Sequence, residues 1–287
     1  PISIYITSFL PEVDIYKVKK IYITSSIVIL CFASLSFWLL NANHAYCWLP
    51  YKNIIQRATS SNTGGVITVD RFGVYNSGVD EAPTQEQAAV ASGTTPYSLG
   101  FRKCLKVTNG NQKSGAGADD YIWIQNLLGA QDIANSGWNY TSSSSFITLQ
   151  FWVKSSVSQD FKGYLRSSEG TEKQYPFATG VLTANTWTKI TKTIAGDSGL
   201  TFDDDNKQGF QINISPFFGT GYTAGGVTEN TWSNYSASAR TPDQTSTWYT
   251  TDNATFEITG IQLEVSDHAT DFEHRSHHVE YELIKNF

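Results

Sequence analysis

The sequence contains no methionine, and charged residues make up only 16% of its 287 positions. Position 1 is occupied by Pro1, so we expect a fragment, a processed product or a translation that lacks its true start. The formal net charge is -6, and dense runs of basic residues are missing apart from Lys17, Lys19 and Lys20. A protein that binds a phosphate backbone needs a basic face, so we expect no nucleic-acid partner.

Cysteine is also scarce, because only Cys31, Cys47 and Cys104 are present. These three residues do not make a disulfide framework. We expect Cys104 to be a small buried apolar side chain rather than a reactive thiol. Motifs for a P-loop, a dinucleotide-binding turn or a nucleophile elbow are missing as well, so the sequence marks no common catalytic constellation.

Aromatic residues, by contrast, make up 14% of the sequence, and Gly, Ser and Thr are plentiful. Such a composition is typical of strands and turns. From Tyr51 onward, short apolar segments alternate with Gly, Ser, Asn and Asp turns, and no strand–helix alternation is visible. The pattern predicts an all-β sandwich or barrel. The length allows one large β domain of about 200 to 250 residues plus a short extra segment.

Residues 1–50 differ from the rest of the chain. Ile21 to Leu40 is an uncharged, mostly apolar run of 20 residues that follows Lys17, Lys19 and Lys20. A membrane helix with positive flanking charge and a leader that is not native to the domain both remain open. A signal peptide fits less well, because its apolar core is usually shorter. We predict an apolar leader or anchor over residues 1–50, with a membrane partner only if residues 21–40 are a true anchor.

The stretch from Thr255 to Ser276 predicts the closing strand of the domain and a polar tail. Glu257, Gln262 and Glu264 are expected on the face opposite the core. Gly260 sits where the alternation changes parity, as a β-bulge requires. The core side of this strand is expected to carry Phe256, Ile258, Ile261, Leu263 and Val265.

Other segments predict further strands. Phe146 to Val153 alternates cleanly, with Ile147, Leu149, Phe151 and Val153 on one face. Phe210, Ile212 and Ile214 likewise oppose Gln211, Asn213 and Ser215. We also expect strands over Gly65 to Tyr75, Leu99 to Thr108 and Trp187 to Ile194, with a loop or short helical turn over Asp80 to Thr95.

Three blocks of the sequence carry a resemblance to a known family: Tyr121 to Trp138, Leu149 to Ser156, and Ile258 to Ser276. They resemble jelly-roll domains, similar to carbohydrate-binding modules, of bacteriophage tail-fibre and other virion proteins. In that family the closing strand reads like GIQLEV and is followed by Ala-Thr-x-Phe-Glu, here Ala269 to Glu273. The resemblance covers roughly residues 53 to 276, and the tail HHVEYELIKNF departs from it.

The resemblance implies a two-sheet antiparallel jelly-roll sandwich and an assembly of three or more copies. We therefore predict a carbohydrate-binding-like domain over residues 51–276 and a C-terminal tail over residues 277–287.

Sugars present apolar C–H faces ringed by hydroxyl groups, so a sugar site offers flat aromatics together with amides or carboxylates. Several predicted strands carry that pairing opposite their aliphatic residues. Trp232 and Tyr235 lie in a long polar segment and are expected to be exposed stacking residues. Trp123 and Trp152 could instead be packed under loops or against a neighbouring subunit. The ligand-binding candidates are Trp232, Tyr235, Tyr222, Trp123, Gln125, Gln150 and Trp152, with Tyr121, Gln211 and Asn213 on the same strand faces.

Two segments carry residues that are typical metal ligands. Asp203, Asp204 and Asp205 form an acidic turn, which could be solvated or could hold a structural calcium ion, although EF-hand spacing is absent. His268, His274, His277 and His278 crowd the C-terminus, but a polar tail lacks the closed fold of a zinc site. We therefore expect no cofactor other than a possible structural calcium.

We predict a non-enzymatic virion protein of a tail fibre or similar appendage, whose jelly roll contacts cell-surface polysaccharide or other virion proteins. No sequence context marks the pair of carboxylates that a glycosidase needs. Multivalent attachment by a homotrimer would supply avidity. The alternatives are a membrane-anchored or secreted cellular adhesin or binding module, and an accessory domain of a polysaccharide-degrading enzyme.

Overall fold

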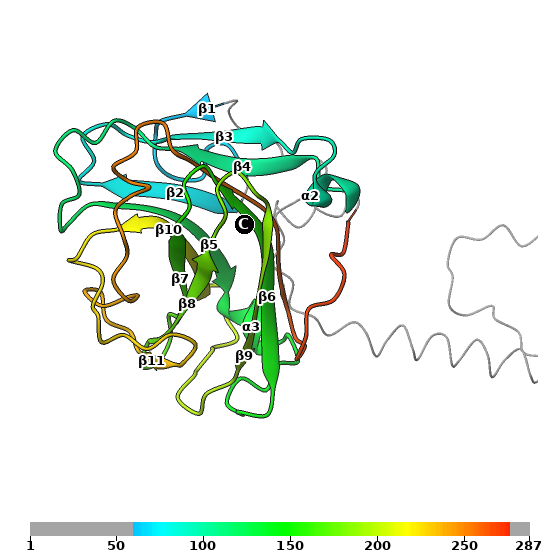
Figure 1. Ribbon diagram of the computed structural model, residues 1–287. Helices are drawn as coiled ribbons and strands as arrows, with labels where there is room; N and C mark the ends of the chain where they lie inside the picture. The colour runs from blue at the N-terminus through cyan, green and yellow to red at the C-terminus, as the bar shows by residue number, and fades with distance from the viewer. Residues whose placement is uncertain (1–59, 70, 276–287) are drawn as a thin grey trace, which may run out of the picture. The chain divides into compact units, whose positions relative to one another are not determined.

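The structure, a computed structural model, describes residues 60–69 and 71–275. These residues form the predicted two-sheet antiparallel jelly-roll sandwich (Figure 1). Sheet A has the strand order β1-β3-β4-β12-β6-β9, and sheet B has the order β11-β8-β7-β10-β5-β2. Within the described ranges, no helix has the length and apolar character needed to cross a membrane. The apolar run 21–40 and the predicted domain boundaries after residues 50 and 276 lie outside the described residues.

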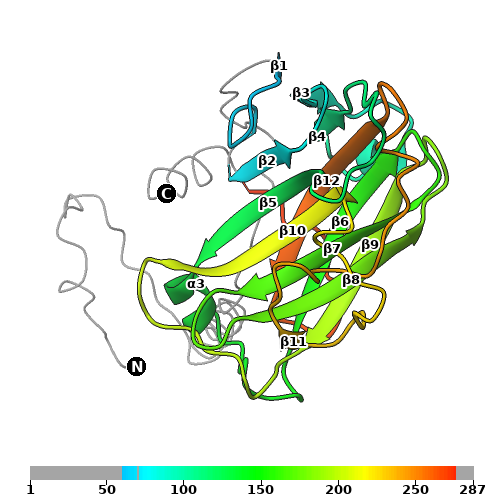
Figure 2. The same ribbon diagram turned by 90° about the vertical axis from the view of Figure 1, so that its left-hand side faces the viewer.

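Sheet A consists of β1 (Ser60–Ser61), β3 (Thr84–Ala89), β4 (Lys103–Thr108), β12 (Thr255–Glu264), β6 (Phe146–Ser155) and β9 (Thr188–Ala195). Sheet B consists of β11 (Ser233–Asn234), β8 (Lys173–Val181), β7 (Asp160–Ser167), β10 (Gln208–Phe218), β5 (Tyr121–Gly129) and β2 (Phe72–Ser77). Among the residues that the structure describes, the connections contain two short helices, α2 (Thr95–Ser98) and α3 (Ala130–Ala134). In Figure 2, β10 runs between β5 and β7, with which it pairs on either side.

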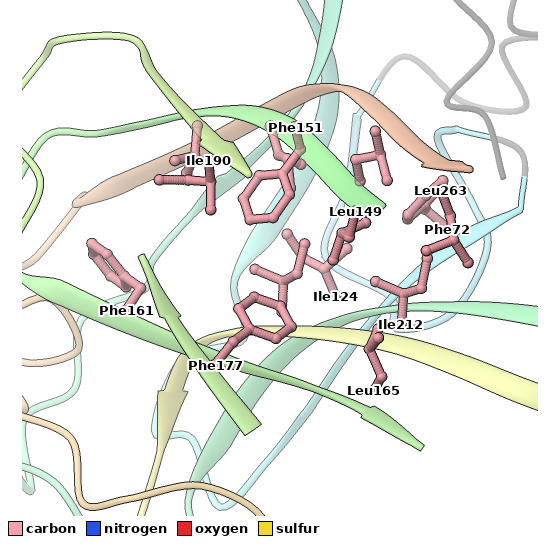
Figure 3. Close-up of a cluster of buried hydrophobic side chains, with 14 of the residues drawn as sticks. Phe72, Ile124, Leu149, Phe151, Phe161, Leu165, Phe177, Ile190, Ile212 and Leu263 are labelled. Carbon is pink, nitrogen blue, oxygen red and sulfur yellow. The ribbon is translucent and has the colours of Figure 1, made fainter. Parts of the chain in front are cut away.

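The hydrophobic core lies between the two sheets. Leu149 and Phe151 of β6 are fully buried, as the alternation of this strand predicts. Figure 3 shows them facing Ile212 of β10 and Phe177 of β8 across the sandwich. The rings of Phe151 and Phe177 lie 6.4 Å apart between centroids. The inner faces of the two sheets therefore form one continuous core.

The closing strand β12 has the bulge that its sequence predicts. Its pairing with β6 shifts register between Thr259 and Gln262, and Gly260 has a φ of 63°. A Cβ at this glycine would lie 2.6 Å from Cζ of Phe101, so only glycine fits without a rearrangement. The bulge lets both Ile258 and Ile261 point into the core.

Two expectations near the N-terminus of the domain were wrong. The predicted strand over 65–75 begins only at Phe72, because Arg71 has a φ of 66° and the chain reverses so that Gly65 pairs with Val74. The segment expected to be a loop or helical turn contains strand β3. The buried side chain of Gln85 in β3 donates hydrogen bonds to Thr63 O at 2.7 Å and Gly65 O at 3.2 Å. These long-range bonds outweigh the weak strand propensity of TQEQAA.

The chain after β12 turns back over the outer face of sheet A. Figure 1 shows this red segment running past β6 toward α2. The carboxylate of Glu264, only 1% exposed, accepts bonds from Thr270 N at 2.9 Å and Thr270 Oγ1 at 2.5 Å. Phe272 packs on Phe101, with ring centroids 4.8 Å apart. This segment, residues 266–275, is called the tail cover below.

Replacing Thr270 with valine is expected to lower the free energy of unfolding by about 1–3 kcal/mol. Valine keeps the shape but removes the hydroxyl donor from a buried carboxylate, which then has an unsatisfied oxygen. Urea unfolding of the full chain measures the change. Thr270→Ser is the matched control, because it keeps the hydroxyl and should lose much less. Equal losses in the two variants would mean that the methyl group, rather than the hydrogen bond, holds the tail cover.

Candidate functional site

The outer face of sheet B carries a group of side-chain amides. Gln125 of β5 lies opposite Asn213 of β10 in the register. Its Nε2 donates to Asn213 Oδ1 at 3.0 Å and to Gln211 Oε1 at 3.2 Å. Asn213 Nδ2 also donates to Gln211 Oε1 at 3.3 Å. Gln125, Gln211 and Asn213 are called the amide cluster. The alternation of the two strands predicts these residues on one face, and the structure brings them together.

Aromatic side chains continue the same face beside the amide cluster. Tyr121 and Trp123 of β5 stack with ring centroids 5.2 Å apart. Phe218 of β10 meets the ring of Trp123 edge-on at 5.4 Å, and Tyr222 meets Tyr121 edge-on at 5.3 Å. Tyr75 of β2 adds a further edge contact to Trp123 at 6.4 Å. These five residues are called the aromatic cluster. All except buried Phe218 are half-buried, so the cluster is partly packed and partly open to solvent.

Residues 219–246, which follow β10, lie over part of this face. This segment is called the strap. In Figure 1 the yellow-to-orange segment after β10 lies on the side of sheet B away from β6. Gln174 of β8 donates from Nε2 to Ala239 O at 2.7 Å. Within the strap, Arg240 N donates to Tyr222 O at 2.8 Å. The strap therefore adds Tyr222, Tyr235 and Arg240 to the outer face of sheet B.

Arg240 is the charged residue at the centre of this arrangement. Its guanidinium carbon lies 4.6 Å from the ring centroid of Trp123 and 4.7 Å from that of Tyr222, within the range of a cation–π interaction. The guanidinium is near enough to Tyr164 to oppose the burial that raises the pKa of that phenol above its ordinary value. Arg240 was not among the residues predicted to bind, although an arginine in a polar segment poor in basic residues is a signal that was available.

Several polar atoms on this face and in the strap are buried without a hydrogen-bond partner among the described residues. They include Nε and Nη1 of Arg240, the indole Nε1 of Trp123, Nε of Arg166 and Oγ of Ser215. Ser215 follows Asn213 on the outer face of β10. Buried donors without partners are unfavourable, and they are uncommon in native proteins. Such atoms beside aromatic rings are suited to hydrogen bonds with the hydroxyl groups of a ligand or with water.

The expectation that Trp232 is an exposed stacking residue was wrong. Its ring is half-buried against Tyr175 and Phe210, with centroids 5.2 and 6.4 Å away, and its Nε1 donates to Ala195 O at 2.8 Å. Trp232 therefore fills the edge of the core, because a large apolar ring gains more from that contact than from solvent exposure. The ring of Tyr235 also has a partner within the chain, since the guanidinium carbon of Arg166 lies 3.8 Å from its centroid in a cation–π contact.

Gln150 and Trp152 lie on sheet A, so they do not share a platform with Trp123. Gln150 is 3% exposed under the tail cover and donates from Nε2 to Thr270 O at 2.7 Å. Trp152 packs against a small second cluster on the outer face that includes Phe101 and Cys104. Cys104 is buried, as predicted, and burial together with the nearby carboxylate of Glu257 raises the pKa of its thiol.

Two carboxylates of the acidic turn, those of Asp203 and Asp205, lie together with the carboxylate of Glu169 from the turn between β7 and β8. Oxygen atoms of Glu169, Asp203 and Asp205 lie within 4.8 Å of one another. Asp204 instead accepts a bond from Asn135 Nδ2 at 2.7 Å. Lys207 Nζ is 2.5 Å from Asp205 Oδ2, and this hydrogen bond lowers the pKa of Asp205. A calcium ion would have to compete with Lys207 for Asp205, and the calcium site stays a prediction.

Comparison with models of protein families gives no match, and no curated protein sequence matches. Solved structures with similar folds include a bacteriophage CBA120 tailspike protein, at 10% identity and a TM-score of 0.38 over 69% of this chain and 20% of that one. The N-terminal cellulose-binding domain of a Cellulomonas fimi β-1,4-glucanase matches at 10% identity and a TM-score of 0.37, over 74% of this chain and 98% of that one. A family 11 carbohydrate-binding module of a Clostridium thermocellum cellulase has 12% identity and a TM-score of 0.33, over 74% and 98% of the two chains.

Proposed function

We propose that this protein binds carbohydrate on the outer face of sheet B and does not cleave it. The observation that supports this most directly is the aromatic cluster beside the amide cluster on one sheet face. Flat rings stack on the apolar faces of sugars, and side-chain amides offer both donors and acceptors to sugar hydroxyls. The unpartnered Trp123 Nε1 and Ser215 Oγ on the same face add polar atoms that a hydroxylated ligand could satisfy.

The charges near this face support binding without cleavage. Asp160 and Glu229 both pair with Lys162, at 2.7 and 2.6 Å. Glu172 pairs with Arg166 at 2.7 Å. A glycosidase needs two carboxylates on opposite sides of the scissile bond, one as acid and one as base or nucleophile. Asp160, Glu229 and Glu172 are thus held in ion pairs, which disfavours that role for these three carboxylates.

The wider role that we propose is host-surface attachment by a virion appendage, with the protein located in the virion. Its support is the resemblance of three sequence blocks to jelly-roll domains of virion proteins. A single site of this kind binds weakly, and assembly into a homotrimer would raise the avidity through effective concentration. Contact with other virion proteins is part of the same proposal. In the alternative roles, as a cellular adhesin or an enzyme accessory module, the same sheet face would bind the sugar, but the domain would be attached to a cell or to an enzyme instead of a virion.

A glycan array probed with the full chain tests the binding proposal. Tyr121→Ala is expected to weaken glycan binding roughly two- to tenfold, because one stacking ring contributes about 0.5–1.5 kcal/mol. Tyr121→Phe keeps the ring and should bind nearly as well as the parent. Trp152→Ala on sheet A is the control for loss of an aromatic residue away from the site.

Three results would contradict the proposal. If the full chain retained no glycan on the array, the proposal that it binds carbohydrate would be contradicted. Equal binding by the parent and Tyr121→Ala would move the site away from sheet B. Release of reducing ends from a bound polysaccharide would overturn the non-enzymatic part.

A further inference from the structure

The cationic side chains on the outer face of sheet B are not equally neutralised. Lys162 and Arg166 of β7 point to this face, and each has a carboxylate partner within 2.7 Å. Arg240 of the strap forms no ion pair within the part of the chain that the structure describes. Arg240 is therefore a cation of the proposed sugar face that these residues do not hold in an ion pair. The carboxylates of Asp119 and Asp120 lie near enough to Tyr222 to add to the burial that raises the pKa of its phenol, but neither forms an ion pair with Arg240.

The surroundings of Arg240 strengthen the effect of that charge. The rings of Trp123, Tyr222 and Phe218 lie 4.6, 4.7 and 5.6 Å from its guanidinium carbon. Aromatic neighbours exclude water and lower the local dielectric constant, so a charge there interacts more strongly with an approaching anion. Nε and Nη1 are buried without a hydrogen-bond partner among the described residues, and the residue as a whole is half-buried.

A carboxylate is the group that suits a guanidinium in such a site. Guanidinium and carboxylate are both planar, and they form short, charge-assisted hydrogen bonds that can be bidentate. A sulfate ester offers the same charge and acceptor oxygens. A neutral sugar would satisfy hydrogen-bond donors but would leave the charge uncompensated, which is unfavourable where water is partly excluded.

We propose that the ligand of this face is an anionic saccharide, with its carboxylate or sulfate group bound by Arg240 and its apolar face against the aromatic cluster. This inference rests on the proposed carbohydrate binding and adds the class of sugar. It also assigns to the strap a direct part in recognition, since Arg240 comes from the strap and Trp123 from sheet B.

The test is an array of matched glycans in uronate-containing, sulfated, and neutral or carboxyl-reduced forms, probed with the full chain and with Arg240→Gln. Glutamine keeps hydrogen-bond donors but removes the charge. We expect the parent to retain anionic glycans preferentially and Arg240→Gln to bind them roughly ten- to a hundredfold more weakly. Arg102→Gln is the matched control, because Arg102 also stacks on a tyrosine, at 3.9 Å from the ring centroid of Tyr97, but near α2.

Salt dependence gives a second readout that needs no variant. Binding of the parent to an anionic glycan should weaken as ionic strength rises, whereas binding to a neutral glycan should hardly change. Preferential binding of neutral glycans, unaffected by salt or by Arg240→Gln, would overturn the inference and leave the proposed function intact. Absence of binding to any glycan would overturn the proposed function, and this inference with it.

Discussion

Replacing Leu263 with alanine is expected to lower the free energy of unfolding by about 2–5 kcal/mol. Leu263 is 1% exposed and pairs with Leu149 of β6 in the register of sheet A. Figure 3 shows its side chain between the two sheets, near Leu149 and Phe72. Loss of the Cγ methine and its two methyl carbons removes buried apolar area, and the well-packed core cannot fully close the resulting cavity.

Urea unfolding of the full chain measures this loss, and an exposed leucine provides the matched control. Leu127 on the outer face of sheet B is 41% exposed, so Leu127→Ala should change stability by no more than about 0.5 kcal/mol. Similar losses for the two leucines would mean that the core side of β12 is wrongly assigned.

The residue next to Leu263 illustrates what the sequence leaves open. The alternation of β12 predicts Gln262 on the opposite face, where truncation should have little effect unless that face is covered. The tail cover does cover it, since Gln262 is fully buried and its Nε2 donates to Thr270 Oγ1 at 3.2 Å. Gln262→Ala is therefore expected to remove a net hydrogen-bond contribution of about 0.5–1.5 kcal/mol as well as packing under the cover.

Strands with one face in the core were predictable from the sequence. In β6, β10 and β12, burial on one side imposes a two-residue period on apolar residues, and a glycine marks the bulge where the period breaks. Strand β3 has no such pattern, because its pairing depends on Gln85 and backbone partners far away in the sequence. Its existence could not be derived from local composition.

The candidate site was predictable only in part, for a related reason. Strand periodicity places Tyr121, Trp123 and Gln125 on one face, but it does not state which strands share a sheet. The pairing of β5 with β10, and the separation of Gln150 onto sheet A, follow from the order of strands in the folded chain. The position of Arg240 over Trp123 depends on the path of the irregular strap. The strap has no periodic pattern of apolar residues from which that path could be predicted.

Raising the pH above about 9 is expected to destabilise the protein steeply. Burial raises the pKa values of the Cys104 thiol and of the Tyr164 and Tyr249 phenols. For Tyr249, the hydrogen bond from its Oη to Asp120 Oδ2 at 3.0 Å also favours the protonated form. These groups keep their protons in the folded state at pH values where the unfolded chain releases them.

The sign of the effect follows from proton linkage. Below the unfolded pKa values, about 8.5 for cysteine and 10 for tyrosine, both states hold these protons and stability does not depend on them. Above those values the unfolded state binds fewer protons than the folded state, so stability falls as pH rises, until the folded pKa values are reached. Each group contributes a slope of up to about 1.4 kcal/mol per pH unit.

Urea unfolding at several pH values between about 8 and 11 measures this slope, with tryptophan fluorescence as the signal. Tyr164→Phe removes one of these titrating groups. Above pH 10, the stability of this variant should therefore fall less steeply than that of the parent, by up to about 1.4 kcal/mol per pH unit. Tyr249→Phe should flatten the slope in the same way, and it also loses the hydrogen bond to Asp120 and so should begin from a lower stability at neutral pH. If the parent and Tyr164→Phe had the same slope, this phenol would ionise as readily in the folded protein as in the unfolded chain. The phenol is only 1% exposed, beneath the strap, which argues against that outcome.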